Sequence, residues 1–224
     1  MLRPKKRLSK KEIKEDKLVT LYFNAQEFIQ QNSKWMLIGA GGIVAIVVIS
    51  ILFASSKRTA ERAASAEFIK GRVEYNAGRY ENAVDILKSM VDNYSGTNSA
   101  KQGMLYLANS FYAMADYDQA LEYYDNFARK YKGEDVLIVS AICGSGNCLV
   151  AKGDYSAAAE KYMQVIEKYP QSLKAPEALL DAGLAYMEAQ NKENAVKAFE
   201  RLVADYPDAK LKQDAEMYLA QLES

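Results

Sequence analysis

The stretch GRVEYNAGRYENAVDILKSMVDNYS, residues 71–95, contains a spacing that recurs along the chain. A small residue is followed twelve places later by an alanine, and large residues stand four, seven and eleven places beyond that alanine. Four copies begin at intervals of 37, 38 and 37 residues. The small residues are Gly71, Ala108, Gly146 and Gly183, and the alanines are Ala83, Ala120, Ala158 and Ala195. The large residues are Leu87, Met90 and Tyr94 in the first copy and Tyr124, Phe127 and Tyr131 in the second. They are Tyr162, Val165 and Tyr169 in the third copy and Phe199, Leu202 and Tyr206 in the fourth. Repeats of this length stack on their neighbours, which predicts an extended protein-binding surface rather than an enclosed catalytic pocket.

Each copy is predicted to be a pair of helices. Positions i, i+4, i+7 and i+11 share one side of an α-helix, so the large residues form an apolar stripe. The small residue lies ahead of a break such as NAGRY, MADYD or AKGDY, which predicts a first helix that crosses the second closely. This unit resembles the tetratricopeptide repeat in its order of Gly, Tyr, Gly, Tyr, Ala, a large apolar residue and Pro. The closing proline is Pro170 or Pro207 in the last two copies, whereas Ser95 and Lys132 replace it in the first two.

The resemblance covers roughly residues 63–208. The copies are longer than the usual repeat, and Lys192 stands where the other copies have tyrosine. The last stretch, AKLKQDAEMYLAQLES, predicts a capping helix in which Leu211, Met217, Leu219 and Leu222 are available for packing. The predicted fold is therefore all-α: a single transmembrane helix, then an α-solenoid of about four tetratricopeptide helix pairs with a C-terminal capping helix.

A second segment predicts a membrane span. WMLIGAGGIVAIVVISILF, residues 35–53, has no charged residue and is long enough to cross a bilayer core, with Trp35 at one interface. Residues 1–34 contain nine Lys or Arg against four acids, whereas residues 54–68 contain only Lys57, Arg58 and Arg62 as basic residues. The positive-inside rule then places the N-terminus in the cytoplasm. The predicted regions are a cytoplasmic tail and amphipathic helix (1–34), a transmembrane helix (35–54), a linker (55–62) and the repeat domain (63–224), which lies in the periplasm if the span crosses a bacterial inner membrane.

Two alternatives accompany this interpretation. Ala54-Ser55-Ser56 is compatible with a cleavage site, so the apolar segment could be a signal peptide, although it is longer than a usual signal core. No cysteine follows closely enough for lipid attachment. Gly41 and Ala45 form a small-xxx-small pair that could support helix pairing and a homo-oligomer, or that is merely tolerated in the span.

Residues before the span are predicted to form an amphipathic helix. Its apolar positions include Leu18, Leu21, Tyr22, Phe28 and Ile29, and the basic run RPKKRLSKK precedes it. Such a helix can lie in the headgroup layer of an anionic membrane, or its apolar stripe can pack against a membrane partner.

Composition argues against an enzyme and against nucleic acid as a partner. The chain has no histidine and no phosphate-binding loop or nucleophile elbow, so we expect no catalytic residue, cofactor or metal site. Residues 55–224 contain 20 basic and 25 acidic side chains and no basic stripe. Cys143 and Cys148 are five residues apart on a predicted helix, which places them beyond disulfide reach.

The resemblance also implies a binding groove. In tetratricopeptide domains the first helices of successive repeats line a concave surface. Aligning the chain to that pattern places there Arg72, Tyr75, Asn76, Tyr106, Asn109, Tyr112 and Asn147. Amide side chains offer donors and acceptors to an extended peptide, and tyrosines offer flat contact area, although the same residues could simply be solvated surface. A lysine-rich clamp for a terminal carboxylate is not apparent.

The whole arrangement is similar to the ancillary subunit of the bacterial Sec translocon, a membrane-anchored family thought to link the translocon to periplasmic chaperones. This likeness implies translocon subunits and secreted or envelope proteins as partners. The last repeats are similar as well to cell-division coordinators and outer-membrane assembly factors, which are soluble or lipid-anchored. A purely structural anchor that oligomerises through Gly41 and Ala45 is a third interpretation.

Overall fold

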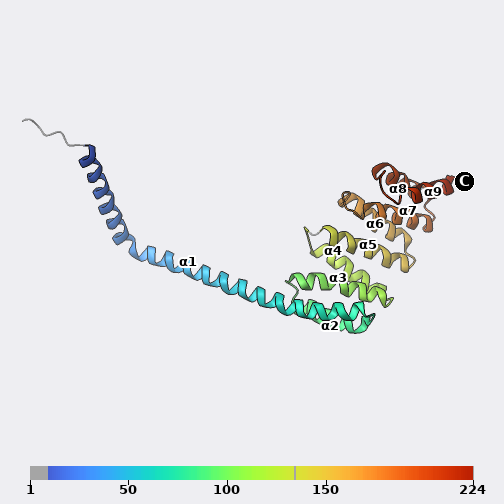
Figure 1. Cartoon of the computed structure of the whole chain (residues 1–224), viewed down its shortest axis with the longest axis horizontal. Coiled ribbons are helices and arrows are strands. Elements are labelled where there is room, and N and C mark those ends of the chain that lie inside the picture. Colours follow the sequence, from blue (N-terminus) through green and yellow to red (C-terminus); the bar gives the residue numbers. More distant parts are fainter. Residues whose placement is uncertain (1–9, 134, 224) are drawn as a thin grey trace, which may run out of the picture. The chain divides into compact units, whose positions relative to one another are not determined.

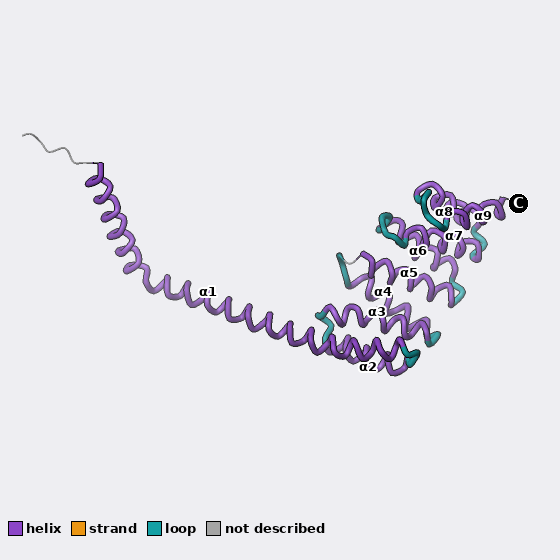
Figure 2. The backbone as a smooth tube through the Cα atoms, in the orientation of Figure 1, coloured by secondary structure: helices purple, strands orange, loops and turns teal. Residues whose placement is uncertain are grey.

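A computed structural model describes residues 10–133 and 135–223, with side chains from Lys17 onward, so residues 1–9 of the predicted basic tail lie outside the described residues. All regular structure in these ranges is helical (Figure 2). The helices are α1 (Lys10–Asn76), α2 (Tyr80–Asn93), α3 (Asn98–Ala113), α4 (Tyr117–Lys130), α5 (Asp135–Ala151), α6 (Tyr155–Lys168), α7 (Ala175–Glu188), α8 (Lys192–Asp205) and α9 (Lys212–Glu223). The chain divides into a unit that ends at Lys57 and a unit that begins at Arg58.

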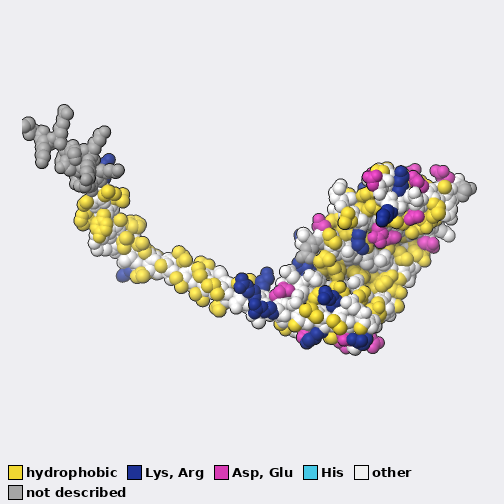
Figure 3. Space-filling view, in the orientation of Figure 1, with side chains coloured by type: hydrophobic (Ala, Val, Ile, Leu, Met, Phe, Trp, Pro, Cys, Tyr) yellow, Lys and Arg dark blue, Asp and Glu magenta, His cyan; other side chains and the backbone are white. Residues whose placement is uncertain are grey.

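In its described residues, the unit that ends at Lys57 consists of the first part of α1. Its apolar side chains are exposed: Trp35 is 74% exposed and Phe53 is 72% exposed. Figure 3 shows these hydrophobic side chains in yellow along this part of α1. Among the described residues, α1 is the one helix long and apolar enough to cross a membrane.

The unit that begins at Arg58 is a stack of helix pairs, as predicted. The pairs are the last part of α1 with α2, α3 with α4, α5 with α6, and α7 with α8, and α9 packs against α8 (Figure 1). One continuous core runs through them, and its fully buried large side chains include Phe127 and Phe199.

The predicted close crossing within each pair depends on a large side chain that lies against a small residue. A Cβ atom built on Gly71, Gly146 or Gly183 would lie 2.6, 2.5 or 2.3 Å from the side chain of Leu87, Tyr162 or Phe199, respectively. The second copy differs, because Ala108 takes the place of glycine. There the Tyr124 ring lies against Gly144 of the following pair, 2.6 Å from where a Cβ atom would be.

The turn within each pair uses a left-handed residue followed by a helix cap. Gly78, Ala115, Gly153 and Gln190 have φ of 73°, 60°, 79° and 58°, and they recur at the spacing of the repeats. The next residue caps the second helix in three copies: Asp116, Asp154 and Asn191 accept hydrogen bonds from the backbone N–H three residues later. A side-chain cap of this kind satisfies one of the unpaired N–H groups at a helix start.

The capping helix differs from the prediction at one residue. Leu211, Leu219 and Leu222 are half-buried against the core, but Met217 is 56% exposed, so the packing predicted for Met217 is wrong. Tyr218 packs instead, stacked on Phe199 with ring centroids 5.3 Å apart. The register of α9 places the tyrosine, rather than the methionine, on the side that faces α8.

One carboxyl group is half-buried between the third and fourth pairs. Asp181 lies on α7, and burial raises its pKa from 3.8 to about 6, with a smaller contribution from Glu177 and an opposing one from Lys174. Burial acts in this direction because it disfavours the charged form of the carboxyl group.

We predict that Gly183→Ala destabilises the protein. Alanine favours a helix over glycine by about 1 kcal/mol, but its methyl group would overlap the buried Phe199 ring, and overpacking costs about 1–3 kcal/mol. Chemical denaturation followed by circular dichroism measures the difference. Gly96→Ala is the control, because a Cβ atom there meets nothing within 4 Å. A Gly183→Ala variant at least as stable as the wild type would contradict the close contact.

We also predict that Asp181→Asn stabilises the protein at pH 8 by an amount on the order of 1 kcal/mol. The folded-state pKa lies above the ordinary value, so the folded state binds more protons between pH 3.8 and about 6. Wild-type stability therefore falls as pH rises through this window, and the variant lacks that loss. Melting curves from pH 4 to pH 8 test this, and parallel curves for the two proteins would show that Asp181 is not responsible.

Candidate protein-binding surface

The residues predicted for the groove lie on the first helix of three successive pairs. We call them the first-helix surface: Arg72, Tyr75 and Asn76 on α1, Tyr106, Asn109 and Tyr112 on α3, and Asn147 on α5. Arg72, Asn76, Tyr112 and Asn147 are exposed, and the other three are half-buried. The surface therefore combines polar and aromatic side chains, some of each kind exposed and some half-buried.

Aromatic contacts join its first two copies. The ring centroids of Tyr75 and Tyr106 are 5.2 Å apart, and Phe68 lies 5.4 Å from Tyr106. The Arg72 guanidinium lies 5.6 Å from the centre of the Phe68 ring. Tyr106 is thus largely a packing residue between α1 and α3.

Tyr112 is the most accessible tyrosine of this set and lies near the third pair. It is 37% exposed, and its ring centroid lies 5.4 Å from that of Tyr117. Burial raises its pKa, with smaller contributions from Cys148 and Tyr117. Its helix, α3, contacts α5 of the third pair.

Two asparagines are held by buried tyrosines of the second helices. The Tyr124 hydroxyl donates to Oδ1 of Asn109, and the Tyr162 hydroxyl donates to Oδ1 of Asn147 at 2.6 Å. Burial raises the pKa of both tyrosines, so both stay protonated as donors. Because Oδ1 is the accepting atom in each bond, the Nδ2 group of each amide remains its hydrogen-bond donor.

The two supporting tyrosines are absent from the predicted site, although the sequence contains a signal for them. Tyrosine follows asparagine by fifteen residues in both copies, as Asn109 with Tyr124 and Asn147 with Tyr162. The copies without the asparagine also lack the tyrosine. They have Arg72 with Leu87, and Leu184 with Phe199, at the same two positions.

A polar network lies between the second and third pairs. Asp125 of α4 accepts from the buried Ser145 hydroxyl of α5 at 2.7 Å and from the Lys161 ammonium of α6 at 2.7 Å. These bonds satisfy a hydroxyl that has no contact with solvent. The network fixes three helices relative to one another.

The remaining reactive side chains are explained by packing. Cys143 and Cys148 of α5 are free thiols, and burial raises their pKa to about 11 and about 12. Thiols with raised pKa values are poor nucleophiles at neutral pH. Within the part of the chain that the structure describes, no three His, Cys, Asp or Glu side chains form a group that could hold a metal ion.

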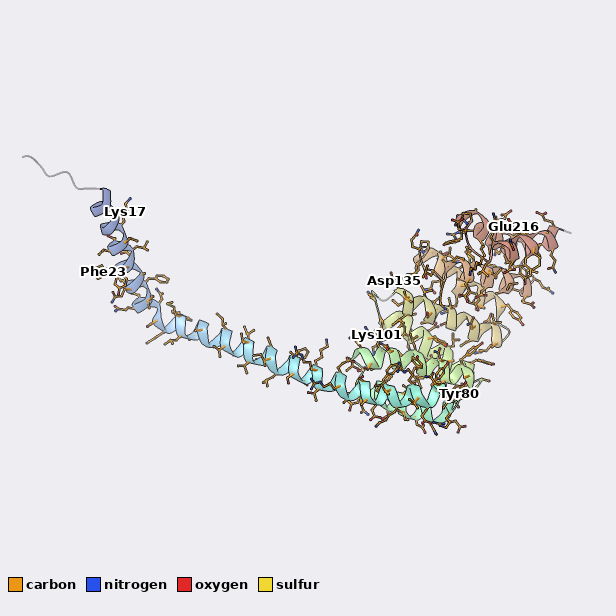
Figure 4. The ribbon with its side chains drawn as sticks, viewed as in Figure 1. Lys17, Phe23, Tyr80, Lys101, Asp135 and Glu216 are labelled. Atoms are coloured by element: carbon orange, nitrogen blue, oxygen red, sulfur yellow. The ribbon has the colours of Figure 1, made fainter. Side chains whose placement is uncertain are left out.

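The predicted membrane-proximal residues are all exposed. Leu18, Leu21, Tyr22, Phe28 and Ile29 are between 51% and 69% exposed on α1, where Figure 4 labels Lys17 and Phe23. In the apolar segment, a Cβ atom on Gly41 would meet nothing within 4 Å. This part of α1 therefore presents an uncovered apolar surface within its own unit.

Comparison with known proteins agrees with this architecture. The family model described as "Tetratricopeptide repeat-like domain" matches residues 26–142, more than half of the chain, and one described as "Tetratricopeptide repeat" matches residues 143–210. None of the curated proteins compared with the chain matches it.

Solved structures share the fold at low identity. A tetratricopeptide repeat protein from Parabacteroides merdae has 15% identity and a TM-score of 0.60, over 72% of this chain and 60% of that one. A protein from Podosopora anserina with nearly identical TPR-like repeats has 17% identity and a TM-score of 0.56, over 70% and 83%. MamA from Desulfovibrio magneticus has 16% identity and a TM-score of 0.53, over 71% and 90%.

The matches to the two family models together extend from residue 26 to residue 210 and agree with the helix pairs described above. Repeats of this kind indicate a scaffold for interactions between proteins. The chain belongs to the tetratricopeptide repeat-like family.

Proposed function

We propose that this protein is a single-pass membrane-anchored scaffold that serves as an ancillary factor of a protein translocon. In this proposal residues 35–53 anchor the chain in a bacterial inner membrane. The first-helix surface binds extended segments of secreted or envelope proteins in the periplasm. The observation that carries the proposal is the combination, in one chain, of an exposed apolar helix and a repeat surface with two fixed amide donors.

The anchor is supported by exposure and by charge. The apolar window of α1 is not buried in the protein, unlike the core helix of a soluble domain. The family match begins at residue 26, so it includes the apolar segment as well as the first repeats. Nine Lys or Arg precede the segment within residues 1–34, which favours a cytoplasmic N-terminus.

The first-helix surface is suited to a peptide backbone rather than to one particular side chain. Asn109 and Asn147 occupy equivalent positions in neighbouring copies, and each is oriented by a tyrosine hydroxyl from the second helix of its own pair. An oriented amide loses less entropy when it binds than a freely rotating one. Two such donors would pair with backbone carbonyl groups, which every extended polypeptide carries, and Tyr112 would add apolar contact area.

A membrane partner is supported by the helix that precedes the span. Leu18, Leu21, Tyr22, Phe28 and Ile29 form an exposed apolar stripe next to a segment that we place in the bilayer. The stripe would pack against an integral translocon subunit. The same stripe would fit the headgroup layer if the protein has no such partner.

We predict that the double variant Asn109→Asp with Asn147→Asp loses about tenfold or more in affinity for unfolded polypeptide. Aspartate keeps the oxygen that accepts from Tyr124 and Tyr162, so the fold is retained. It replaces the Nδ2 donor by an oxygen that repels a carbonyl group. Fluorescence anisotropy with labelled, reduced and alkylated lactalbumin measures the affinity of the full chain in detergent.

The matched control is Asn93→Asp, which makes the same change at an exposed asparagine of α2. Melting temperature is measured for every variant, because only a loss of affinity without a loss of stability is informative. Equal affinities for the wild type and the double variant would remove the first-helix surface from the proposal.

We further predict that photocrosslinkers at Phe28 and Tyr112 report different partners in native membranes. Phe28 should crosslink to a multi-span translocon subunit, and Tyr112 should crosslink to secreted proteins or chaperones. A crosslinker at Lys88, an exposed residue of α2, is the control for random encounters. Crosslinks to cell-wall or outer-membrane assembly factors, with none to a translocon, would instead favour an envelope-assembly role.

A further inference from the structure

The part of α1 within the repeat unit has an exposed side that its own repeats leave uncovered. We call this the outer face: Arg58, Arg62, Ala66, Ile69 and Val73. Successive members are four, four, three and four residues apart, so they share one side of the helix. Ile69 and Val73 are 50% and 54% exposed, whereas Ala64 and Phe68, on the opposite side, are buried against the repeats.

The same positions in the later copies are covered by the preceding pair. The equivalents of Ala66, Ile69 and Val73 are Gly103, Tyr106 and Ser110 on α3, Ala141, Gly144 and Cys148 on α5, and Ala178, Asp181 and Ala185 on α7. Seven of these nine residues are buried, and Tyr106 and Asp181 are half-buried.

Helices provide this cover in the later copies. Met90 of α2 lies against Gly103, and the Tyr124 ring of α4 lies against Gly144. The first copy has no preceding pair, so its equivalent surface is open. The shape that fits the outer face is therefore another helix, packed as the second helix of a preceding repeat would be.

Charge indicates which kind of helix fits. Arg58 and Arg62 lie on the outer face, on the N-terminal side of its apolar residues Ala66, Ile69 and Val73. Figure 3 shows dark-blue side chains gathered on α1 close to the repeats. A partner helix with carboxylates beside its apolar stripe would complement this arrangement.

The carboxylates of this part of α1 are engaged elsewhere. Glu61 accepts from the backbone N–H groups of Asn98 and Ser99 at 2.8 and 3.0 Å, which caps α3. Glu74 accepts from the Arg79 guanidinium at 2.9 Å, and this bond lowers its pKa to about 2. Glu67 pairs with Lys70 at 2.7 Å. None of the three belongs to the outer face, whose own charged residues are both arginines.

A second copy of the chain fits the outer face poorly. In a symmetric contact between two outer faces, Arg58 and Arg62 of one copy would approach the same arginines of the other. Like charges placed together at an interface oppose association. A partner of opposite charge removes this repulsion and retains the apolar contact with Ile69 and Val73.

We infer that the outer face docks an amphipathic helix of a partner protein, in which an apolar stripe is flanked by Asp or Glu. This inference goes beyond the proposed function, because it uses a different surface and does not depend on Asn109, Asn147 or the membrane anchor.

The test uses two designed peptides, each about 20 residues long, or about six helical turns. Both have Leu and Ala every third or fourth residue, and one has Glu and the other Lys beside that stripe. Binding to the full chain in phosphatidylcholine nanodiscs is measured by fluorescence anisotropy. The Glu peptide should bind about tenfold tighter than the Lys peptide, or better.

Two variants separate the apolar and charged contributions. Ile69→Asp with Val73→Asp should abolish binding of the Glu peptide, and Arg58→Glu with Arg62→Glu should reverse the preference between the peptides. All four residues are exposed, so both variants should fold, which circular dichroism checks. Val136→Asp is the matched control, because Val136 is 74% exposed and lies on α5.

Several results would overturn the inference. They are equal affinity for the two peptides, no binding of either, or binding that survives Ile69→Asp with Val73→Asp. Self-association of the chain that Val73→Asp abolishes would identify a second copy as the occupant. Loss of Glu-peptide binding in Asn109→Asp with Asn147→Asp would place the peptide on the first-helix surface instead.

Discussion

The contact of a large side chain with a small residue is the interaction on which the repeat unit depends. Leu87 on Gly71, Tyr162 on Gly146 and Phe199 on Gly183 bring the two helices of a pair close enough to share one core. Such contacts leave almost no space for an added methyl group, and protein interiors gain their stability from packing at this density. The second copy shows that the contact can be displaced, because Tyr124 uses Gly144 of the next pair.

This packing also prepares the surface that we propose for binding. A tyrosine at the crossing has a hydroxyl beyond its ring, and in two copies that hydroxyl reaches an asparagine on the first helix. The buried ring contact and the asparagine amide are therefore parts of one arrangement. Copies with Leu87 or Phe199 at the crossing retain the packing and have no hydroxyl to orient a neighbour. A tyrosine–asparagine hydrogen bond therefore joins the two helices in the second and third copies and is absent from the first and fourth.

The sequence predicts the helix pairs well because they depend on local periodicity. The stripe of Ala83, Leu87 and Met90 is buried as its spacing indicates. Other features depend on tertiary contacts that spacing alone does not fix. The bonds from Tyr124 and Tyr162 to asparagines require the helices to be placed first. The register of α9 decides which of two adjacent side chains faces α8, and Tyr218 rather than Met217 packs there. The open side of α1 becomes visible only when the covered equivalents on α3, α5 and α7 are known.

The claim that Asn109 and Asn147 offer their amide N–H groups to an extended polypeptide is tested most directly by nuclear magnetic resonance. The side-chain amide signals of the full chain in micelles are recorded with and without reduced and alkylated lactalbumin. The account predicts that the Asn109 and Asn147 signals shift on binding, while those of Asn82 and Asn93 on α2 stay in place. Binding that leaves the Asn109 and Asn147 signals unchanged would contradict it.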